Sequence, residues 1–338
     1  MNKDFCSFRG PHPLGSPPVC VRPRPPPMNR RSFLRSTAAL AATAPFASSL
    51  SAQSAPASTR TATKASRKNP KGFMFATLNS ETSKKLSLRE KFQLLRDAGF
   101  TGVEPSSAMN QAEVLAARDA TGLQIPSVVI ATHWAKPLSD PNPATRQIGL
   151  DGLLHGLRDA KAYGASSVLL VPGAVTKQVS YTEAFARSAA EIKKAVPLAE
   201  ELGVVIAIEN VWNQLLLSPR EAVEFTDAFK SPFVQWHFDV GNVVNSGFPE
   251  HWIRTLGPRI VKIHVKEFSR KLRDTKGLRE GFKVDLMEGD SDWPAVMGAL
   301  DSIGYNGWLI TEQWRADGLT DQTYLEKLSA KLDAILAV

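Results

Sequence analysis

The chain has 338 residues, with 41 Lys and Arg against 33 Asp and Glu, and a formal net charge of +8. The charge is uneven, because residues 1–70 hold eleven basic side chains and one acid, Asp4, which leaves 30 basic and 32 acidic side chains for the body. A nearly neutral body lacks the basic surface of a nucleic-acid-binding protein, so we expect no nucleic-acid partner. Both cysteines, Cys6 and Cys20, precede the body, which excludes disulfides, zinc knuckles and thiol nucleophiles from it.

Residues 1–57 resemble an N-terminal extension followed by a twin-arginine export signal. The segment before Met28 is rich in Pro and poor in apolar side chains, and Met28 is the expected true start. Arg30 and Arg31 are followed by a Phe-Leu pair, a weakly apolar Ala-rich stretch and small residues suited to cleavage within 51–58. That stretch is shorter than the roughly 20 residues of a membrane span, so we expect no stable membrane anchor.

The leader therefore predicts export through the twin-arginine translocase to the periplasm. A polar stretch rich in Ala, Ser and Thr, 58–71, is expected to be a flexible linker. The catalytic domain is expected at 72–338.

Eight short apolar runs in the body predict eight β-strands. They are rich in Val and Ile and lack polar alternation, as expected of parallel strands buried on both faces. In chain order they are "FMFATL", "GVEPS", "IPSVVIA", "SSVLLVPG", "VVIAIENV", "VQWHFDV", "IVKIHVK" and "GWLITEQ".

Segments of helical period separate these runs. Ser87 with Glu90 and Ser218 with Glu221 have capping-box spacing, and a final helix is expected at 323–338. The alternation predicts an α/β fold, a single (β/α)8 TIM barrel. An open doubly wound sheet is the alternative, but no Gly-x-Gly-x-x-Gly or Gly-Lys-Ser/Thr loop follows a strand.

Four ligand-type side chains stand at the ends of four consecutive predicted strands, where barrel enzymes carry their chemistry. They are Glu209 in "AIEN", Asp239 in "FDV", His264 in "KIHVKE" and Glu312 in "ITEQ". Each alone has a structural explanation; Asp239, for example, stands where it would cap the next helix. Three carboxylates that converge without a cation would be costly, so the set predicts a metal site.

The donor set also limits the choice of ion. Three carboxylates and one imidazole, with no thiolate, suit a hard or borderline divalent cation. We expect one Mn²⁺ or Mg²⁺, with Co²⁺ and Zn²⁺ as alternatives. His264 would bind through a neutral ring nitrogen, and its other ring nitrogen then requires a partner.

These residues, with "EGDSDWPAVMGALDSIGYNGW" before the last strand, resemble the sugar phosphate isomerase/epimerase family of xylose isomerase-like TIM barrels. The resemblance covers about 73–330. In the ketose 3-epimerase branch, two glutamates bind the metal and act as acid and base on opposite faces of the substrate. The resemblance implies these roles for Glu209 and Glu312, and a substrate contact for Arg270, six residues after His264.

Two positions depart from that branch. Asn242 stands where those epimerases have a substrate-contacting histidine, and Leu215 where they have a further glutamate. An asparagine can still hydrogen-bond a hydroxyl group, whereas a leucine cannot. The departures argue against a free-ketose 3-epimerase and leave the metal ligands and the paired glutamates intact.

Other candidates for substrate contact are Glu104 on the second predicted strand, His133 and Trp134 after the third, and Asn213 after the fifth. With Asn242 and Arg270 they complete the predicted substrate-binding set. Two further tryptophans, Trp212 and Trp314, stand near strand ends, where an aromatic face either stacks on a sugar or packs in the barrel.

Together these features predict a metal-dependent sugar isomerase or epimerase that acts through a metal-stabilised enediolate. The substrate is expected to be a small carbohydrate, with an oxidised sugar or glycoside suited to a periplasmic enzyme. Loss of a hydroxyl from the same enediolate would make a lyase, as in the related inosose dehydratases. A non-catalytic sugar-binding barrel is a third possibility, and the oligomeric state stays open, a homo-oligomer included.

DNA repair by an endonuclease IV type of barrel is disfavoured. Such enzymes use three zinc ions and many histidines, whereas the body has five: His133, His155, His237, His251 and His264. The body also lacks the positive charge that a phosphate backbone attracts.

Overall fold

The computed structural model describes residues 67–315 and 318–338. The predicted extension, export signal and cleavage region lie outside the described residues, as does the linker up to residue 66. From Arg67 the chain packs on the barrel, since the Arg67 guanidinium pairs with Asp301 at 2.7 Å. Lys71, the last residue of the predicted linker, begins the first strand.

Eight parallel strands form one sheet in the order β2-β1-β8-β7-β6-β5-β4-β3. All eight predicted runs form strands. Their bounds are β1 Lys71–Met74, β2 Gly102–Glu104, β3 Ser127–Val129, β4 Ser167–Leu170, β5 Val205–Glu209, β6 Val234–Asp239, β7 Ile260–Val265 and β8 Leu309–Thr311. Single parallel bridges, Gly102 with Gln124 and Ser106 with Val129, join the β2 region to the β3 region and bring the sheet's two edges together. The predicted (β/α)8 barrel is confirmed.

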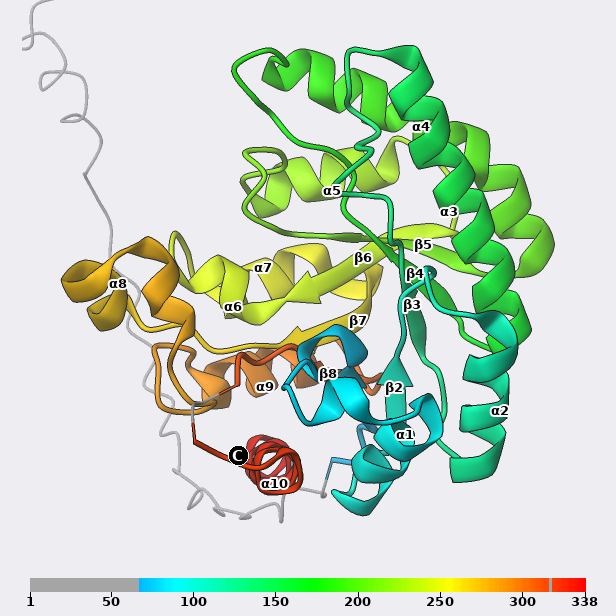
Figure 1. Cartoon of the computed structure of the whole chain (residues 1–338). Coiled ribbons are helices and arrows are strands. Elements are labelled where there is room, and N and C mark those ends of the chain that lie inside the picture. The colour runs from blue at the N-terminus through cyan, green and yellow to red at the C-terminus, as the bar shows by residue number, and fades with distance from the viewer. Residues whose placement is uncertain (1–66, 316–317) are drawn as a thin grey trace, which may run out of the picture. The chain divides into compact units, whose positions relative to one another are not determined.

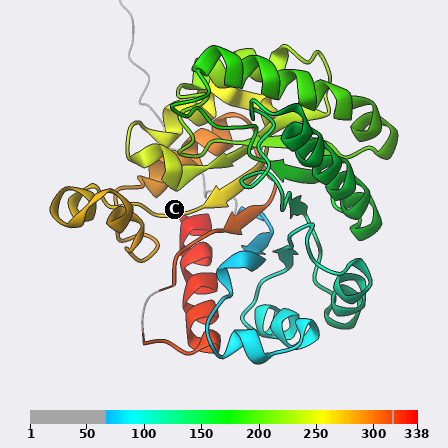
Figure 2. The same cartoon turned by 45° about the horizontal axis from the view of Figure 1, so that its top comes forward.

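Helices surround the strands (Figures 1 and 2). Their bounds are α1 Leu88–Asp97, α2 Gln111–Thr121, α3 Pro143–Tyr163, α4 Tyr181–Leu202, α5 Pro219–Asp227, α6 Val240–Val244, α7 Pro249–Leu256, α8 Arg270–Lys276, α9 Trp293–Ser302 and α10 Asp321–Ala337. The predicted capping boxes at the starts of α1 and α5 are both formed. The final helix, α10, begins two residues earlier than predicted and packs against α1 and α9.

The apolar core lies between the strands and the helices that cover them. Phe73, Ile206, Phe238 and Ile263, from four different strands, have no exposed side-chain surface. Burying an aliphatic or aromatic side chain contributes roughly 1.5–3 kcal/mol to the stability of the fold. Packing against the covering helices therefore holds these strands in place. None of the described helices is long and apolar enough to cross a membrane.

Connections of different length cap the carboxyl end of the barrel. The link between β7 and α9 is the most elaborate, because it carries α8 and a 3-10 helix over Leu278–Phe282. The link between β5 and α5 is an irregular loop over residues 210–218. These two segments form walls of the site described next.

Candidate active site

Four predicted ligands lie together at the carboxyl ends of adjacent strands. Glu209 and Asp239 are the last residues of β5 and β6, His264 lies on β7, and Glu312 directly follows β8. Strand pairing places Asp239 opposite His264. One donor atom from each of the four residues lies within 4.8 Å of the others, a spacing that could hold a metal ion.

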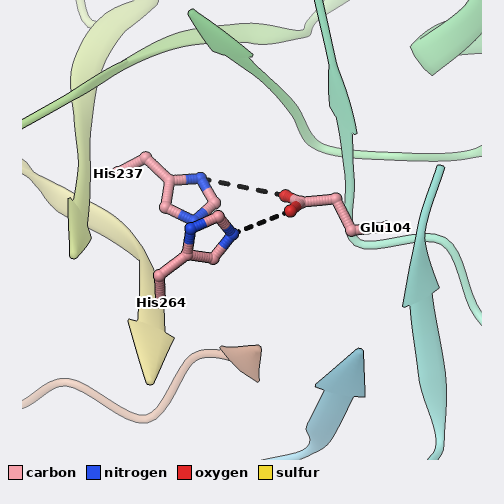
Figure 3. A group of neighbouring side chains, drawn as sticks. All are labelled: Glu104, His237 and His264. Atoms are coloured by element: carbon pink, nitrogen blue, oxygen red, sulfur yellow. Dashed lines mark hydrogen bonds and ion pairs between the residues drawn. The ribbon is translucent and has the colours of Figure 1, made fainter. Parts of the chain in front are cut away.

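His264 stands at the centre of this cluster. Its Nδ1 atom lies 3.1 Å from Glu209 Oε1, 3.0 Å from Glu312 Oε2 and 4.0 Å from Asp239 Oδ2. The other ring nitrogen, Nε2, lies 2.8 Å from Glu104 Oε2 across the barrel (Figure 3). Glu104 would therefore be the partner that metal ligation by His264 requires, because its carboxylate orients the ring.

Asp239 serves two purposes with its two oxygens. Oδ1 accepts a hydrogen bond from the Asn242 amide at 2.7 Å and so caps α6, as the local sequence suggests. Oδ2 faces the cluster and lies 3.1 Å from Lys266 Nζ. Because burial disfavours its charge, the pKa of Asp239 is raised to about 7. The helix-capping and ligand roles considered for Asp239 are thus compatible.

Lys266 is a site residue that the strand-end argument overlooked. Its ammonium group lies 2.8 Å from Glu312 Oε1 as well as 3.1 Å from Asp239, and the residue is only 5% exposed. Gly241 makes room for it, since a Cβ atom there would lie 2.8 Å from Lys266 Cγ. The period of two along β7 places Lys262 and His264 on one face, and continuing it one residue past the strand reaches Lys266, a signal present in "KIHVKE".

The electrostatics of the cluster favour a further positive charge. Burial lowers the pKa of His264, but the charge of Glu104 and hydrogen bonds to the other carboxylates raise it well above its ordinary value. Burial raises the pKa of Glu209. Burial acts on Glu312 in the same direction, but the charge of Lys266 and a hydrogen bond from His264 outweigh it and lower the pKa of Glu312.

A divalent cation fits this arrangement by charge and by donor chemistry. Four carboxylates surround the histidine: Glu104, Glu209, Asp239 and Glu312. Two buried ammonium groups, Lys262 and Lys266, interact with them. Metal ligation would require a neutral His264 ring, and with all four carboxylates ionised the group would then carry two negative charges. Oxygen donors with one imidazole suit a hard or borderline ion.

A second group of possible ligands lies deeper in the barrel. Glu104, His237 and His264 also bring donor atoms within 4.8 Å of one another. His237 Nδ1 is 3.9 Å from Glu104 Oε1, beyond hydrogen-bond distance, and neither ring nitrogen of His237 has a hydrogen-bond partner. Figure 3 shows both rings beside the Glu104 carboxylate. Because burial lowers the pKa of His237 well below its ordinary value, this ring is neutral.

A cavity of about 470 Å³, here called the reaction cavity, adjoins the cluster. Its volume lies in the usual range for small-molecule sites. Residues that line it include Glu209, Glu312, Lys266, His133, Trp134 and Asn242. Three of the predicted substrate contacts, His133, Trp134 and Asn242, therefore face the same space as the paired glutamates.

The other three predicted substrate contacts do not line the reaction cavity. Glu104 is fully buried against His264. Arg270 Nε and Nη2 donate to the carbonyls of Val244 and Gly247, so its guanidinium ties the α6 region to the start of α8. Asn213 donates to Gly173 O at 2.7 Å and accepts from the Leu215 amide, which makes it an organiser of its own loop.

Further aromatic and polar groups complete the walls. Trp212 and Trp314 both line the reaction cavity, and Trp314 is 55% exposed at its rim. Asn210, which the sequence argument overlooked, accepts from the amide of Asp239 at 3.0 Å and donates to its carbonyl at 2.8 Å. This pair of bonds locks the ends of β5 and β6 together and fixes the spacing of their ligands.

Comparison with known proteins identifies the family. A sequence model of the xylose isomerase-like TIM barrel family matches residues 92–334, well over half of the chain. The chain belongs to this family. It is 26% identical over 241 residues to L-ribulose-5-phosphate 3-epimerase UlaE of Escherichia coli O1:K1 / APEC, a match that covers 67% of this chain and 81% of that protein. The corresponding protein of Salmonella paratyphi C (strain RKS4594) is 25% identical over the same length and coverage.

Solved structures share the fold of this xylose isomerase-like barrel. An L-ribulose 3-epimerase superposes with a TM-score of 0.64 at 19% identity, covering 80% of this chain and 95% of that chain. The 3-keto-D-glucoside 4-epimerase YcjR from E. coli gives a TM-score of 0.65 at 16% identity, covering 78% and 99%. The relatives found by sequence and by structure thus include several sugar epimerases.

Proposed function

We propose that this protein is a metal-dependent sugar isomerase or epimerase. The observation that carries the proposal is the pairing of Glu209 and Glu312 on one cavity, beside a cluster whose donor atoms suit a divalent ion. Sequence relatives that are 25–26% identical and named as sugar-phosphate epimerases support the same class of reaction.

The reaction begins with removal of a proton from a carbon beside a carbonyl group. The ligands for the ion would be Glu209, Asp239, His264 and Glu312. When bound, a divalent cation such as Mn²⁺ or Mg²⁺ would stabilise the negative charge that develops on neighbouring substrate oxygens, by several kcal/mol. Glu104 would hold the ring of His264 in the orientation that ligation needs.

The two glutamates would then exchange protons with the substrate. One carboxylate takes the proton and the other returns one, either to the opposite face of the same carbon or to the adjacent carbon. Asn242 and His133 line the cavity where they would hydrogen-bond hydroxyl groups, and Trp134 at the rim would cover a sugar face. Return to the same carbon is epimerisation, and return to the adjacent carbon is isomerisation.

Solvent exchange tests this proposal. A ketose or keto-glycoside that the enzyme turns over in deuterated water should gain deuterium on the carbon next to the carbonyl. Glu209→Gln or Glu312→Gln should lower turnover by about 10² to 10⁴ at saturating metal, where a weakened metal site alone would be rescued. Glu191→Gln, in a buried glutamate paired with Arg146 on the barrel exterior, is the matched control. Turnover without solvent exchange would overturn the proposed mechanism.

We also propose that the protein is exported through the twin-arginine pathway. The support is the order of features in the leader: paired arginines, a Phe-Leu pair, an Ala-rich stretch and small residues. Replacing Arg30 and Arg31 together by Lys should leave the precursor in the cytoplasm, detected by fractionation. A double variant that still reaches the periplasm would contradict the proposal.

A further inference from the structure

A second cavity of about 380 Å³ adjoins the reaction cavity. The two share Val211, Trp212, Asn242 and Arg279 in their walls. The reaction cavity alone has the volume of a complete small-molecule site, so the second cavity is additional space beside it. A substrate that is held at the paired glutamates and extends past Trp212 would enter the second cavity.

Apolar and polar side chains share the lining of the second cavity about equally. The apolar part includes Leu216, Leu217, Val243, Trp252 and Leu278, and amide side chains stand beside them. Arg279 is the only charged residue among those that line this cavity. Two of these apolar side chains are unusually exposed, Leu217 at 60% and Leu278 at 52%. Apolar side chains that face water around a cavity favour an apolar ligand group.

The loop that forms one wall is held in a strained conformation. Gln214 and Leu216 have positive φ angles of 61° and 56°, a region that residues other than glycine seldom adopt, and such strain concentrates at binding sites. Side chains outside the loop fix its backbone. The Tyr181 hydroxyl accepts from the Leu216 amide at 3.3 Å, and Glu221 Oε2 accepts from the Leu217 amide at 2.7 Å. The second cavity is thus a preformed feature.

We propose that the second cavity is a subsite for the aglycone of a glycoside whose sugar ring occupies the reaction cavity. The inference rests on the proposed function only in taking the ring to be a carbohydrate. A free monosaccharide would leave Leu217 and Leu278 in water. A sugar phosphate would place a dianion in a cavity whose lining has one guanidinium and no other charged side chain.

The test is calorimetric binding to the full-length protein, with matched methyl and 4-nitrophenyl glycosides of D-glucose, D-galactose, D-xylose and L-arabinose. At least one aryl glycoside should bind about tenfold more tightly than its methyl partner, because the ring buries apolar surface. Leu217→Asn and Leu278→Asn should remove that preference, and Leu217→Met should keep it. Ile148→Asn, in an apolar side chain that is 47% exposed on α3, is the matched control.

The outcomes separate this inference from the proposed function. Aryl preference without turnover of any keto form would support the subsite and contradict the isomerase assignment. If the protein turns over a keto sugar but binds no aryl glycoside more tightly than its methyl partner, the subsite is contradicted and the proposed function is not. This holds whether both glycosides bind or neither does. D-glucose 6-phosphate binding more tightly than every aryl glycoside, and losing that affinity in Arg279→Gln, would also overturn it.

Discussion

The two halves of the barrel, β1 to β4 and β5 to β8, contribute differently to the site. All four proposed ligands come from the second half, one from each strand or its end. The first half supplies Glu104, which holds His264 from across the barrel, and His133 and Trp134, which line the cavity. The proposed chemistry thus lies in one half and the residues that orient it lie in the other, so we expect substitutions in the two halves to have effects of different magnitude.

The largest effect is expected for a ligand of the second half. Asp239→Asn or His264→Ala should abolish stoichiometric metal binding, because each removes one donor from a four-residue set. Elemental analysis of the purified wild type should find about one divalent ion per chain, and the variants should contain almost none. Circular dichroism should show that both variants stay folded. A wild-type protein without a stoichiometric divalent ion would refute the assignment of all four ligands.

The second half also contains a buried ammonium group, that of Lys266. The variant Lys266→Met tests whether a metal ion can replace its charge. Removing it leaves Asp239 buried without its partner, so the free energy of unfolding should fall by about 3 kcal/mol in chelator. Excess Mn²⁺ should recover most of that loss, because the ion would then balance the carboxylates. Urea unfolding with and without Mn²⁺ measures both values, and an equal loss in the two conditions would contradict this account.

Much of the difference between the two halves of the barrel could be predicted from the sequence, because it depends on local sequence pattern and on strand topology. Apolar runs rich in Val and Ile specify the eight strands, and parallel strands bring Glu209, Asp239, His264 and Glu312 to one end of the barrel. Lys266 could have been found in the same way, since it directly follows β7 and lies two residues beyond His264 in the same alternation.

Contacts across the barrel and within loops were beyond local pattern. Glu104 meets His264 over a separation of 160 residues, and only the closed barrel fixes that distance. Arg270 and Asn213 donate hydrogen bonds to backbone carbonyls and do not line the cavity. Polar side chains can satisfy the backbone groups of loops, and no sequence periodicity predicts which groups these are. The family resemblance placed Arg270 near the site, and the position after the fifth strand placed Asn213 there, but neither could assign their hydrogen-bond partners.

An intermediate effect is expected for the residue in the first half that acts through His264. Glu104→Gln should weaken metal affinity by about 10- to 100-fold, the usual cost of losing a carboxylate behind a metal-binding imidazole. Titration calorimetry with Mn²⁺ measures the change. Asp159→Asn is the matched control, because this carboxylate is also buried in the first half and accepts a hydrogen bond from Gln111 instead. Equal losses in the two variants would show a general effect of fewer buried charges.

The smallest effect concerns His133, the first-half residue that lines the cavity without facing the cluster. Burial lowers its pKa to about 4, so the folded protein keeps the ring neutral while the unfolded chain protonates it near pH 6.5. Its contribution to stability is therefore present above about pH 6.5 and is lost as the pH falls toward 4. Between about pH 7 and about pH 5.5, protonation of His133 in the unfolded chain should lower the free energy of unfolding by roughly 1 kcal/mol.

Urea titrations of His133→Gln at several pH values test this prediction. The variant should lose this pH dependence of the free energy of unfolding. It also loses the hydrogen bond that Nδ1 accepts from the Val171 amide, and that loss should be the same at every pH. His251→Gln, whose parent side chain is 67% exposed, should keep the wild-type slope. If both variants keep it, protonation of His133 does not limit acid stability, and this wall of the cavity is open to water.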